Sequence, residues 1–321
     1  KAIAGRGWLV LAALIWGLAF VSQVQGMDSM SPLFFNATRF SLGALSLIPL
    51  LVFLRMRKGK DGEGNGEGNQ AVPPTVTMGN GREVTLPAWA GNQIVVGIIC
   101  GLVLFTASTT QQYGVLYSRS AGRSGFITAL YIVMVPLLAF AVLRRRIHLN
   151  VILSVALAVL GFYLLCITGG FGSITLADLV PLASAVLFAV HILVIDTLGR
   201  GLDALVISFF QIATTALLSW IGALAEGSVD WAGAGQGWFA IVYAGIGSVG
   251  VAYTLQVVGQ QCVPPTRGAM LMSLESFFSA LGGAIILGEV MTPRGYLGCA
   301  LIFAGTMLAQ LPVDRLKRQR P

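Results

Sequence analysis

Residues 101–118 read GLVLFTASTTQQYGVLYS, and residues 245–262 read GIGSVGVAYTLQVVGQQC. These stretches begin two longer segments, 101–164 and 245–308, that align without a gap at a constant spacing of 144 residues (245 minus 101). We therefore expect a duplicated unit, whose second copy repeats the structure of the first. Identical residues recur along the alignment at Gly101/Gly245, Thr110/Thr254, Gln112/Gln256, Leu130/Leu274, Leu137/Leu281, Leu143/Leu287, Ala156/Ala300, Gly161/Gly305 and Leu164/Leu308.

The composition is that of a membrane protein. Of 321 residues, 56% are hydrophobic and only 10% are charged, and the mean hydropathy is +0.82. So few charges cannot cover the surface of a soluble globular protein of this length. The net charge of +7 comes from Lys and Arg clusters beside apolar runs, a pattern typical of contact with lipid headgroups. We expect a lipid bilayer, and no nucleic acid, as partner.

Ten apolar segments are long enough to cross about 30 Å of hydrocarbon as helices of roughly 20 residues. Helices are expected because backbone groups in a bilayer must pair within the segment, and the runs lack the alternation of a barrel. The predicted fold is an all-α integral membrane protein of about ten transmembrane helices in two inverted five-helix repeats. The segments lie near 8–24, 33–54, 88–112, 122–143, 149–167, 176–196, 204–225, 236–258, 267–287 and 293–311.

The two halves, residues 1–168 and 169–311, are predicted to have opposite orientations in the membrane. A unit that crosses the bilayer five times places its copy upside down, which is how secondary transporters build one site with two gates. With the N-terminus inside, most Lys and Arg residues fall on the cytoplasmic side, and the outer loops keep only Arg119, Arg123 and Arg294. We therefore expect both termini to be cytoplasmic.

Two segments differ from the apolar pattern. Residues 59–87 include GKDGEGNGEGNQAVPP, which is too polar to bury a core, and we interpret them as a flexible cytoplasmic linker within the first repeat. A regulatory docking role for this linker is the alternative. Residues 312–321 form a basic cytoplasmic tail that is expected to anchor at headgroups.

No cofactor or metal is predicted. The four cysteines lie in or beside apolar stretches without a CxxC spacing, so neither a zinc site nor a disulfide framework is indicated. The chain contains no P-loop pattern GxxxxGK[ST], so transport driven by ATP is not indicated either. The cysteines are Cys100, Cys166, Cys262 and Cys299.

Glu275 is the deepest acid in the predicted spans. It lies about eight residues into its segment, or ~12 Å at 1.5 Å per residue. An ionisable group at that depth normally faces a cavity or a partner. The spacing of 144 residues pairs Glu275 with Tyr131 in the first copy, so the two are expected to line a central cavity near the midplane. The alternative is a structural acid paired with a helix dipole or with Arg39.

Arg39 lies near the start of the second predicted span, with Asn36, Gly43 and Ser46 on the same helical face. Its side chain could point into the cavity or extend to the outer interface, and both interpretations stay open.

Several other polar and aromatic residues are candidates for contact with a substrate. His191 could move protons with a substrate, although a lone histidine in an apolar helix is more often a packing residue. Gln112 and Gln256 occupy equivalent positions, so each could bind a polar substrate atom or form an interhelical hydrogen bond. Aromatic rings in the spans could pack on a substrate or form the core. The aromatic candidates are Trp16, Phe20 and Tyr253.

The chain resembles the EamA domains of the drug/metabolite transporter superfamily. The resemblance rests on four stretches and covers nearly the whole chain apart from 59–87. It implies a ten-helix inverted-repeat carrier of the inner (plasma) membrane that exports amino acids or other small metabolites, with Arg39, Glu275 and Glu289 matching typical family positions. The first copy departs from the family pattern at the turn equivalent to Glu289. The stretches are WGLAF, MSPLFFNATRFSLGALSLIPLL, GRSGFITALYIVMVPLLAFAVL and LMSLESFFSALGGAIILGEVMT.

The predicted function is secondary transport of a small molecule by alternating access, driven by a substrate gradient or by exchange for protons. A flippase or lipid-linked sugar carrier is the alternative, and it would need a larger polar chamber. An integral-membrane enzyme is a remote alternative, because it would need acids, histidines or metal ligands clustered near one face. We therefore expect no enzymatic activity, and the sequence indicates no oligomeric state.

Overall fold

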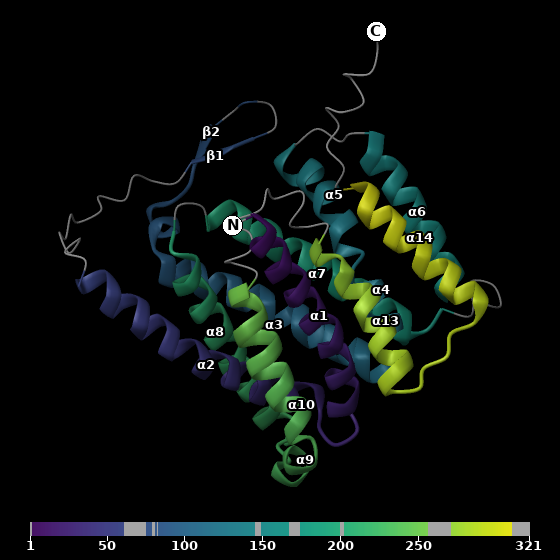
Figure 1. The fold of residues 1–321 in the computed structure, drawn as a ribbon. Coiled ribbons are helices and arrows are strands. Elements are labelled where there is room, and N and C mark those ends of the chain that lie inside the picture. Colours follow the sequence, from purple (N-terminus) through teal and green to yellow (C-terminus); the bar gives the residue numbers. More distant parts are fainter. Residues whose placement is uncertain are drawn as a thin grey trace.

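The structure is a computed structural model that describes residues 2–60, 75–78, 81, 83–144, 149–166, 174–199, 202–255 and 271–309. Helices dominate these residues, and the chain is an all-α multi-pass membrane protein, as predicted (Figure 1). Within the described residues, eight helices are long and apolar enough to cross a membrane.

Each of the ten predicted segments contains helix. Two of them, α13 and α14, have 13 and 17 described residues and are shorter than the other spans. The short helix α9 (Trp231–Gln236) lies between two spans. The spans are α1 (Ala2–Gly26), α2 (Pro32–Lys60), α3 (Gln93–Ser118), α4 (Ala121–Thr128) with α5 (Tyr131–Leu143), α6 (Leu149–Cys166), α7 (Leu176–Leu198), α8 (Ala204–Ala225), α10 (Trp238–Val242) with η3 (Tyr243–Ala252), α13 (Leu274–Ile286) and α14 (Pro293–Ala309).

The structure describes parts of the segment 59–87, which the sequence predicts to be a flexible cytoplasmic linker, and these parts contain regular secondary structure. Helix α2 continues to Lys60, and the strands β1 (Thr75–Thr77) and β2 (Glu83–Thr85) pair antiparallel with Thr75 opposite Thr85. A 3₁₀ turn, η1 (Ala88–Gly91), then leads into α3. The β-branched sequences TVT and EVT favour this hairpin. Residues 61–74 and the basic tail 312–321 lie outside the described residues.

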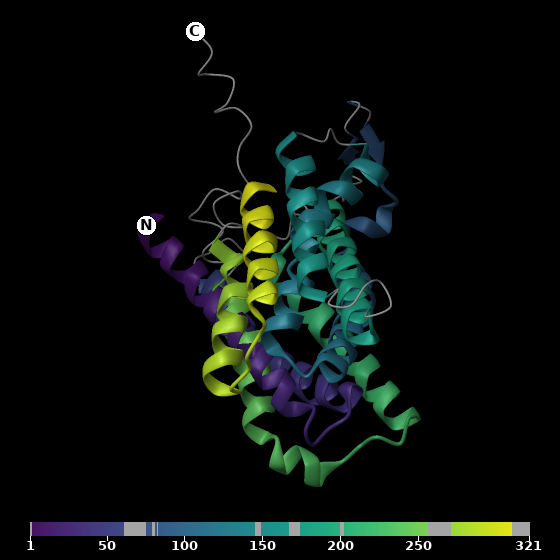
Figure 2. The same cartoon turned by 90° about the vertical axis from the view of Figure 1, so that its right-hand side faces the viewer.

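The main helix contacts between the two halves of the chain occur in corresponding pairs. Helix α3 packs on α7 and α8, and its counterpart η3 packs on α1 and α2. The pairs α2 with α8, α4 with α13, and α6 with α14 each join a span to its own counterpart, and α6 and α14 lie side by side in Figures 1 and 2. Helix α7 contacts α4 and α5, just as α1 contacts α13. This pattern is the one expected when a two-fold axis relates two copies of one unit.

Both copies interrupt a helix at the same place. In the first copy, a turn at Ala129 and Leu130 separates α4 from α5, and the N–H of Ile132 donates to the carbonyl of Ala129 at 3.1 Å, three residues back. In the second copy, a turn at Ser273 precedes α13, and Ser273 is the residue equivalent to Ala129. Interrupted helices at mid-membrane depth are typical of carrier binding sites.

The π-helix η3 packs closely on α2. A Cβ atom on Gly245 would lie 2.9 Å from the carbonyl oxygen of Arg39, and one on Gly250 would lie 2.2 Å from Ser46 Oγ. On the other helix, a Cβ on Gly43 would lie 2.3 Å from Val249 Cγ1. Glycine on both helices therefore lets two backbones approach at the level of Arg39.

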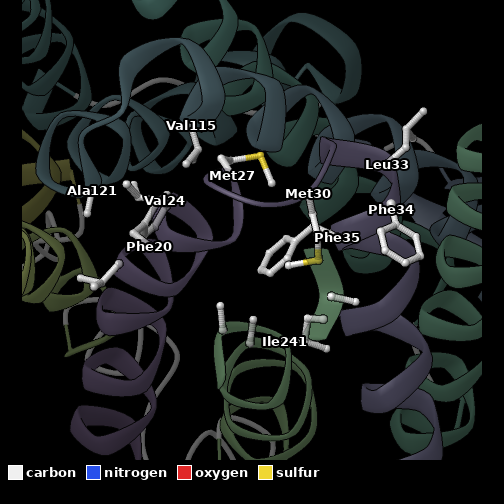
Figure 3. Close-up of a cluster of buried hydrophobic side chains, with 14 of the residues drawn as sticks. Phe20, Val24, Met27, Met30, Leu33, Phe34, Phe35, Val115, Ala121 and Ile241 are labelled. Atoms are coloured by element: carbon white, nitrogen blue, oxygen red, sulfur yellow. The ribbon is translucent and has the colours of Figure 1, made fainter. Parts of the chain in front are cut away.

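Apolar side chains close one end of the bundle, around the turn between α1 and α2. Phe34 and Phe35 from α2 are fully buried there, with Val115 from α3 and Ala121 from α4. Figure 3 shows Met27 and Met30 of the turn pointing into the same cluster. The start of α1 and the hairpin β1–β2 lie at the opposite end of the molecule (Figure 1).

Candidate functional site

Glu275 occupies the first turn of α13, directly after the interruption at Ser273. Helix α1 crosses α13 at this level, because a Cβ on Gly17 would lie only 2.7 Å from the carbonyl oxygen of Glu275. Within the described part of the chain, the Glu275 carboxylate has no hydrogen-bond or ion-pair partner. An unpaired acid in a helix at this depth is expensive unless it faces water or a ligand.

Tyr253 and Trp16 form the aromatic wall beside Glu275. Their rings meet edge to face, with centroids 5.2 Å apart and an interplanar angle of 72°. The indole N–H of Trp16 donates to the carbonyl of Ser248 at 3.1 Å, within the π-helix η3. This bond fixes α1 against η3 and orients the Trp16 ring toward Tyr253.

Arg39 lies inside the protein, because its side chain is only 4% exposed. Its Nε donates to Asn36 Oδ1 at 2.9 Å, and its guanidinium lies 5.5 Å from the Phe35 ring centroid and 4.9 Å from that of Phe40. Contacts with aromatic faces partly compensate for the lost hydration of a buried cation. Within the described residues no carboxylate forms an ion pair with Arg39. Of the two orientations that the sequence left open, the structure has the inward one.

The ionisable groups of four different spans lie within electrostatic reach of one another, and an aromatic ring of a fifth span lies beside them. Tyr253 lies within electrostatic reach of both Arg39 and Glu275, and Tyr131 lies within reach of Glu275 and Tyr253. The Phe188 ring of α7 lies 6.5 Å from the ring of Tyr131. The sequence predicted that Tyr131 and Glu275 would lie near each other, and the structure brings them together with Arg39.

Tyr131, Tyr253 and Glu275 are each half-buried, so part of every one of these side chains remains accessible.

The remaining predicted residues have other surroundings. Phe20 is 2% exposed within the apolar cluster of Figure 3, so it could contact a substrate only if α1 and α4 separated. Gln112 Nε2 donates to the carbonyl of Gln23 at 3.2 Å, which joins α3 to α1. His191 is buried, and its Nε2 lies within hydrogen-bond distance, 3.1 Å, of Gln211 Oε1 on α8. Gln256 lies outside the described residues.

Sequence reasoning missed the role of one buried acid and the ring of Phe188. Asp178 is fully buried in the first turn of α7, where it forms an ion pair with Arg123 of α4 and a capping box with Thr175. The T-x-x-D pattern before an apolar run was the available signal for the capping box. No sequence signal marked the contact with Arg123, because it joins two repeats.

The site offers one cation-binding group and one anion-binding group in a single low-dielectric space. Arg39 can bind a carboxylate through its free guanidinium nitrogens, and Glu275 can accept hydrogen bonds from an ammonium group. The hydroxyl groups of Tyr131 and Tyr253 can bind either. Among the described residues, no group of three or more His, Cys, Asp or Glu lies together as a metal site would require.

The chain matches the EamA-like transporter family over residues 3–167 and 175–311. An uncharacterized transporter of Archaeoglobus fulgidus is 26% identical over 305 residues, which cover 95% of this chain and 85% of that protein. The uncharacterized transporter YwfM of Bacillus subtilis is 23% identical over 94% of this chain and 92% of its own length.

Two further similarities concern cargo and fold. The threonine/homoserine exporter RhtA of Escherichia coli K12 is 27% identical over 217 residues, which cover 62% of this chain and 71% of RhtA. One solved crystal structure superposes over all of both chains with a TM-score of 0.62 at 18% identity, which shows a common fold.

Proposed function

The chain belongs to the EamA-like transporter family, and on that premise we propose that it is a secondary transporter that exports amino acids across the plasma membrane by alternating access. The substrate would bind between the two halves, in a cavity that we propose to be lined by Tyr131, Tyr253 and Glu275. Transport, and not catalysis, is the activity proposed.

The unpaired charges of Arg39 and Glu275 are the observation on which this proposal depends. A buried cation and a buried acid normally pair with each other, because each is costly alone. Here Tyr253 lies within electrostatic reach of both groups, and within the described residues neither has an ion-pair partner. A zwitterion would satisfy both groups at once, with its carboxylate at Arg39 and its ammonium at Glu275. In an α-amino acid, an ammonium group and a carboxylate group are attached to the same carbon atom.

Similarity to RhtA supports the same substrate class, since that relative is a threonine/homoserine exporter. The walls of the site are aromatic, with Trp16, Tyr131 and Phe188 around the charged groups. They would contact the side chain of the amino acid. We therefore propose a small neutral amino acid, such as threonine, as the first cargo to test.

Alternating access would arise from the two copies, which we propose to be residues 1–168 and 169–311 in opposite orientations with both termini cytoplasmic. The neighbour pattern of the spans supports this arrangement, because the main contacts between the two halves occur in corresponding pairs. The interruptions at Ala129–Leu130 and at Ser273 would act as hinges on the two sides of the site. Exchange for protons at Glu275 would supply the driving force.

A flux assay in proteoliposomes tests the proposal. Threonine efflux is measured for the wild type and for the Arg39→Gln, Glu275→Gln and Tyr131→Phe variants. We expect loss of transport in the two charge variants and a weaker effect in Tyr131→Phe, which keeps the ring. Leu217→Ala, on an exposed position of α8, is the matched control and should transport normally. Normal threonine flux in both charge variants would refute the assigned site.

A further inference from the structure

Glu289 lies just beyond the end of α13, in a turn that directs it toward another helix. Gly288 has φ 67°, a left-handed conformation that favours glycine. The backbone N–H of the next residue, Glu289, donates a hydrogen bond to the carbonyl of Gly283 at 3.0 Å. The Glu289 carboxylate then covers Gly283, where a Cβ would lie 2.6 Å from Oε2. Glycine at both positions therefore places this carboxylate between α13 and the start of α4.

The carboxylate of Glu289 caps the N-terminus of α4. It accepts hydrogen bonds from Ser120 Oγ at 2.7 Å, from the amide of Ala121 at 2.6 Å and from the amide of Gly122 at 3.2 Å. The first amides of a helix have no partner within the helix, and the helix dipole favours a negative charge beside them. We call this set of contacts the Glu289 latch, formed by Glu289 with Ser120, Ala121 and Gly122.

Two more acids hold the same end of α4. Arg119, just before the helix, pairs with Asp28 of the α1–α2 turn at 2.6 Å. Arg123, in its first turn, pairs with the fully buried Asp178 of α7. The start of α4 is thus fixed to three neighbouring elements by three carboxylates.

Helices α4 and α13 are also in close contact one turn after Ala121. A Cβ on Gly125 would lie 2.0 Å from Ser279 Oγ.

The equivalent positions, 144 residues away, lack the chemistry to form the same latch at the opposite end. At the spacing of 144 residues, Arg145 stands in place of Glu289, and a cation cannot accept hydrogen bonds from helix amides. Pro264 and Pro265 stand in place of Ser120 and Ala121, and proline has neither an N–H nor a hydroxyl group. Arg144 has φ 52°, so the left-handed turn equivalent to Gly288 is present without the acid.

We propose that the Glu289 latch is a one-sided gate, which keeps the carrier closed at the end of the bundle that holds Glu289 and must release before the site opens there. This proposal rests on the alternating access of the proposed function. Release would let α4 turn about Ala129 and Leu130, directly before Tyr131 in the site. The asymmetry between the two ends would make the resting carrier open toward the opposite end.

Thiol labelling of a position between the latch and the site tests this proposal. Thr128→Cys is placed in a background in which the four native cysteines are alanine, because Thr128 is 4% exposed and close in size to cysteine. A membrane-impermeant maleimide is added to each face of sealed vesicles without substrate. Val290→Cys, at a position 91% exposed and next to Glu289, identifies which face carries the latch.

The latch predicts that Glu289→Gln raises the labelling rate of Thr128→Cys about tenfold from the Glu289 face, because charge-assisted hydrogen bonds are the strong ones. Ser120→Ala removes one donor only and should give a smaller rise in the same direction. Val290→Ala is the control and should change nothing. Size-exclusion profiles identify the variants that fold. If Glu289→Gln does not fold, the labelling rate measured with Ser120→Ala decides whether the latch exists.

Unchanged labelling in folded variants would overturn the latch. Because no substrate is present, this result is separate from the proposed function: normal threonine flux with unchanged labelling would refute the latch alone. Raised labelling in a protein that does not transport threonine would support the latch and refute the cargo.

Discussion

Gly17→Ala is expected to destabilise the protein by forcing α1 away from α13 at the site. A Cβ at position 17 would lie 2.5 Å from Phe278 Cβ and 2.7 Å from the Glu275 carbonyl oxygen. Neither atom is at the end of a flexible side chain, so the helices themselves must move. Overpacking of this kind typically costs about 1–3 kcal/mol.

Gly7→Ala provides the matched control, because Gly7 lies in the same helix and a Cβ there would meet nothing within 4 Å. Both substitutions gain the intrinsic helix preference of alanine, at most about 1 kcal/mol. The difference between the two variants therefore isolates the packing cost. We expect Gly17→Ala to be less stable than Gly7→Ala by about 1–3 kcal/mol. A difference of about 2 kcal/mol changes the folding equilibrium roughly thirtyfold.

Reversible unfolding in mixed micelles, followed by tryptophan fluorescence, measures that difference. Trp16 is next to the substituted residue, so the same experiment reports any change in its surroundings. Equal stability of Gly17→Ala and Gly7→Ala would refute the close crossing of α1 and α13, and with it the placement of Trp16 beside Glu275.

Two further predictions concern the charged groups and the aromatic wall. Asp178→Asn should lower the free energy of unfolding by up to about 3 kcal/mol, because Arg123 loses its buried partner, and adding Arg123→Gln should restore part of the loss in the same unfolding assay. If the second substitution added to the loss, the ion pair would be refuted. Tyr253→Phe keeps the edge-to-face contact with Trp16 and should change stability by less than about 1 kcal/mol. It should raise the KM for transport, since it removes a hydroxyl group that lies within electrostatic reach of both Arg39 and Glu275. An unchanged KM would exclude that hydroxyl from the site.

The sequence was sufficient to predict the helical segments of the fold and to relate two residues of the proposed site. Each of the ten apolar segments contains helix within the described residues, since hydrocarbon demands long apolar helices. The spacing of 144 residues related Tyr131 to Glu275, and the structure places them within electrostatic reach. The sequence left Arg39 between two orientations, because its position near a helix end allowed either one.

Features that depend on contacts between repeats could not be read from the sequence. The turn at Ala129 and Leu130 contains neither glycine nor proline, so no local signal predicts it. The Glu289 latch joins residues 169 positions apart in the chain, from Ser120 to Glu289. The hairpin of β1 and β2 was missed because the surrounding polar composition outweighed two short runs of β-branched residues.

Competition against threonine flux, by compounds that carry one or both charges, tests most directly whether Arg39 and Glu275 bind a zwitterion. Threonine, its analogue without the amino group, and its analogue without the carboxylate are each added to proteoliposomes containing the wild-type protein. If Arg39 and Glu275 together bind a zwitterion, unlabelled threonine will compete strongly and each single-charge analogue will compete at least about tenfold more weakly, since either one leaves a buried charge unpaired. Equal competition by all three compounds would contradict the account.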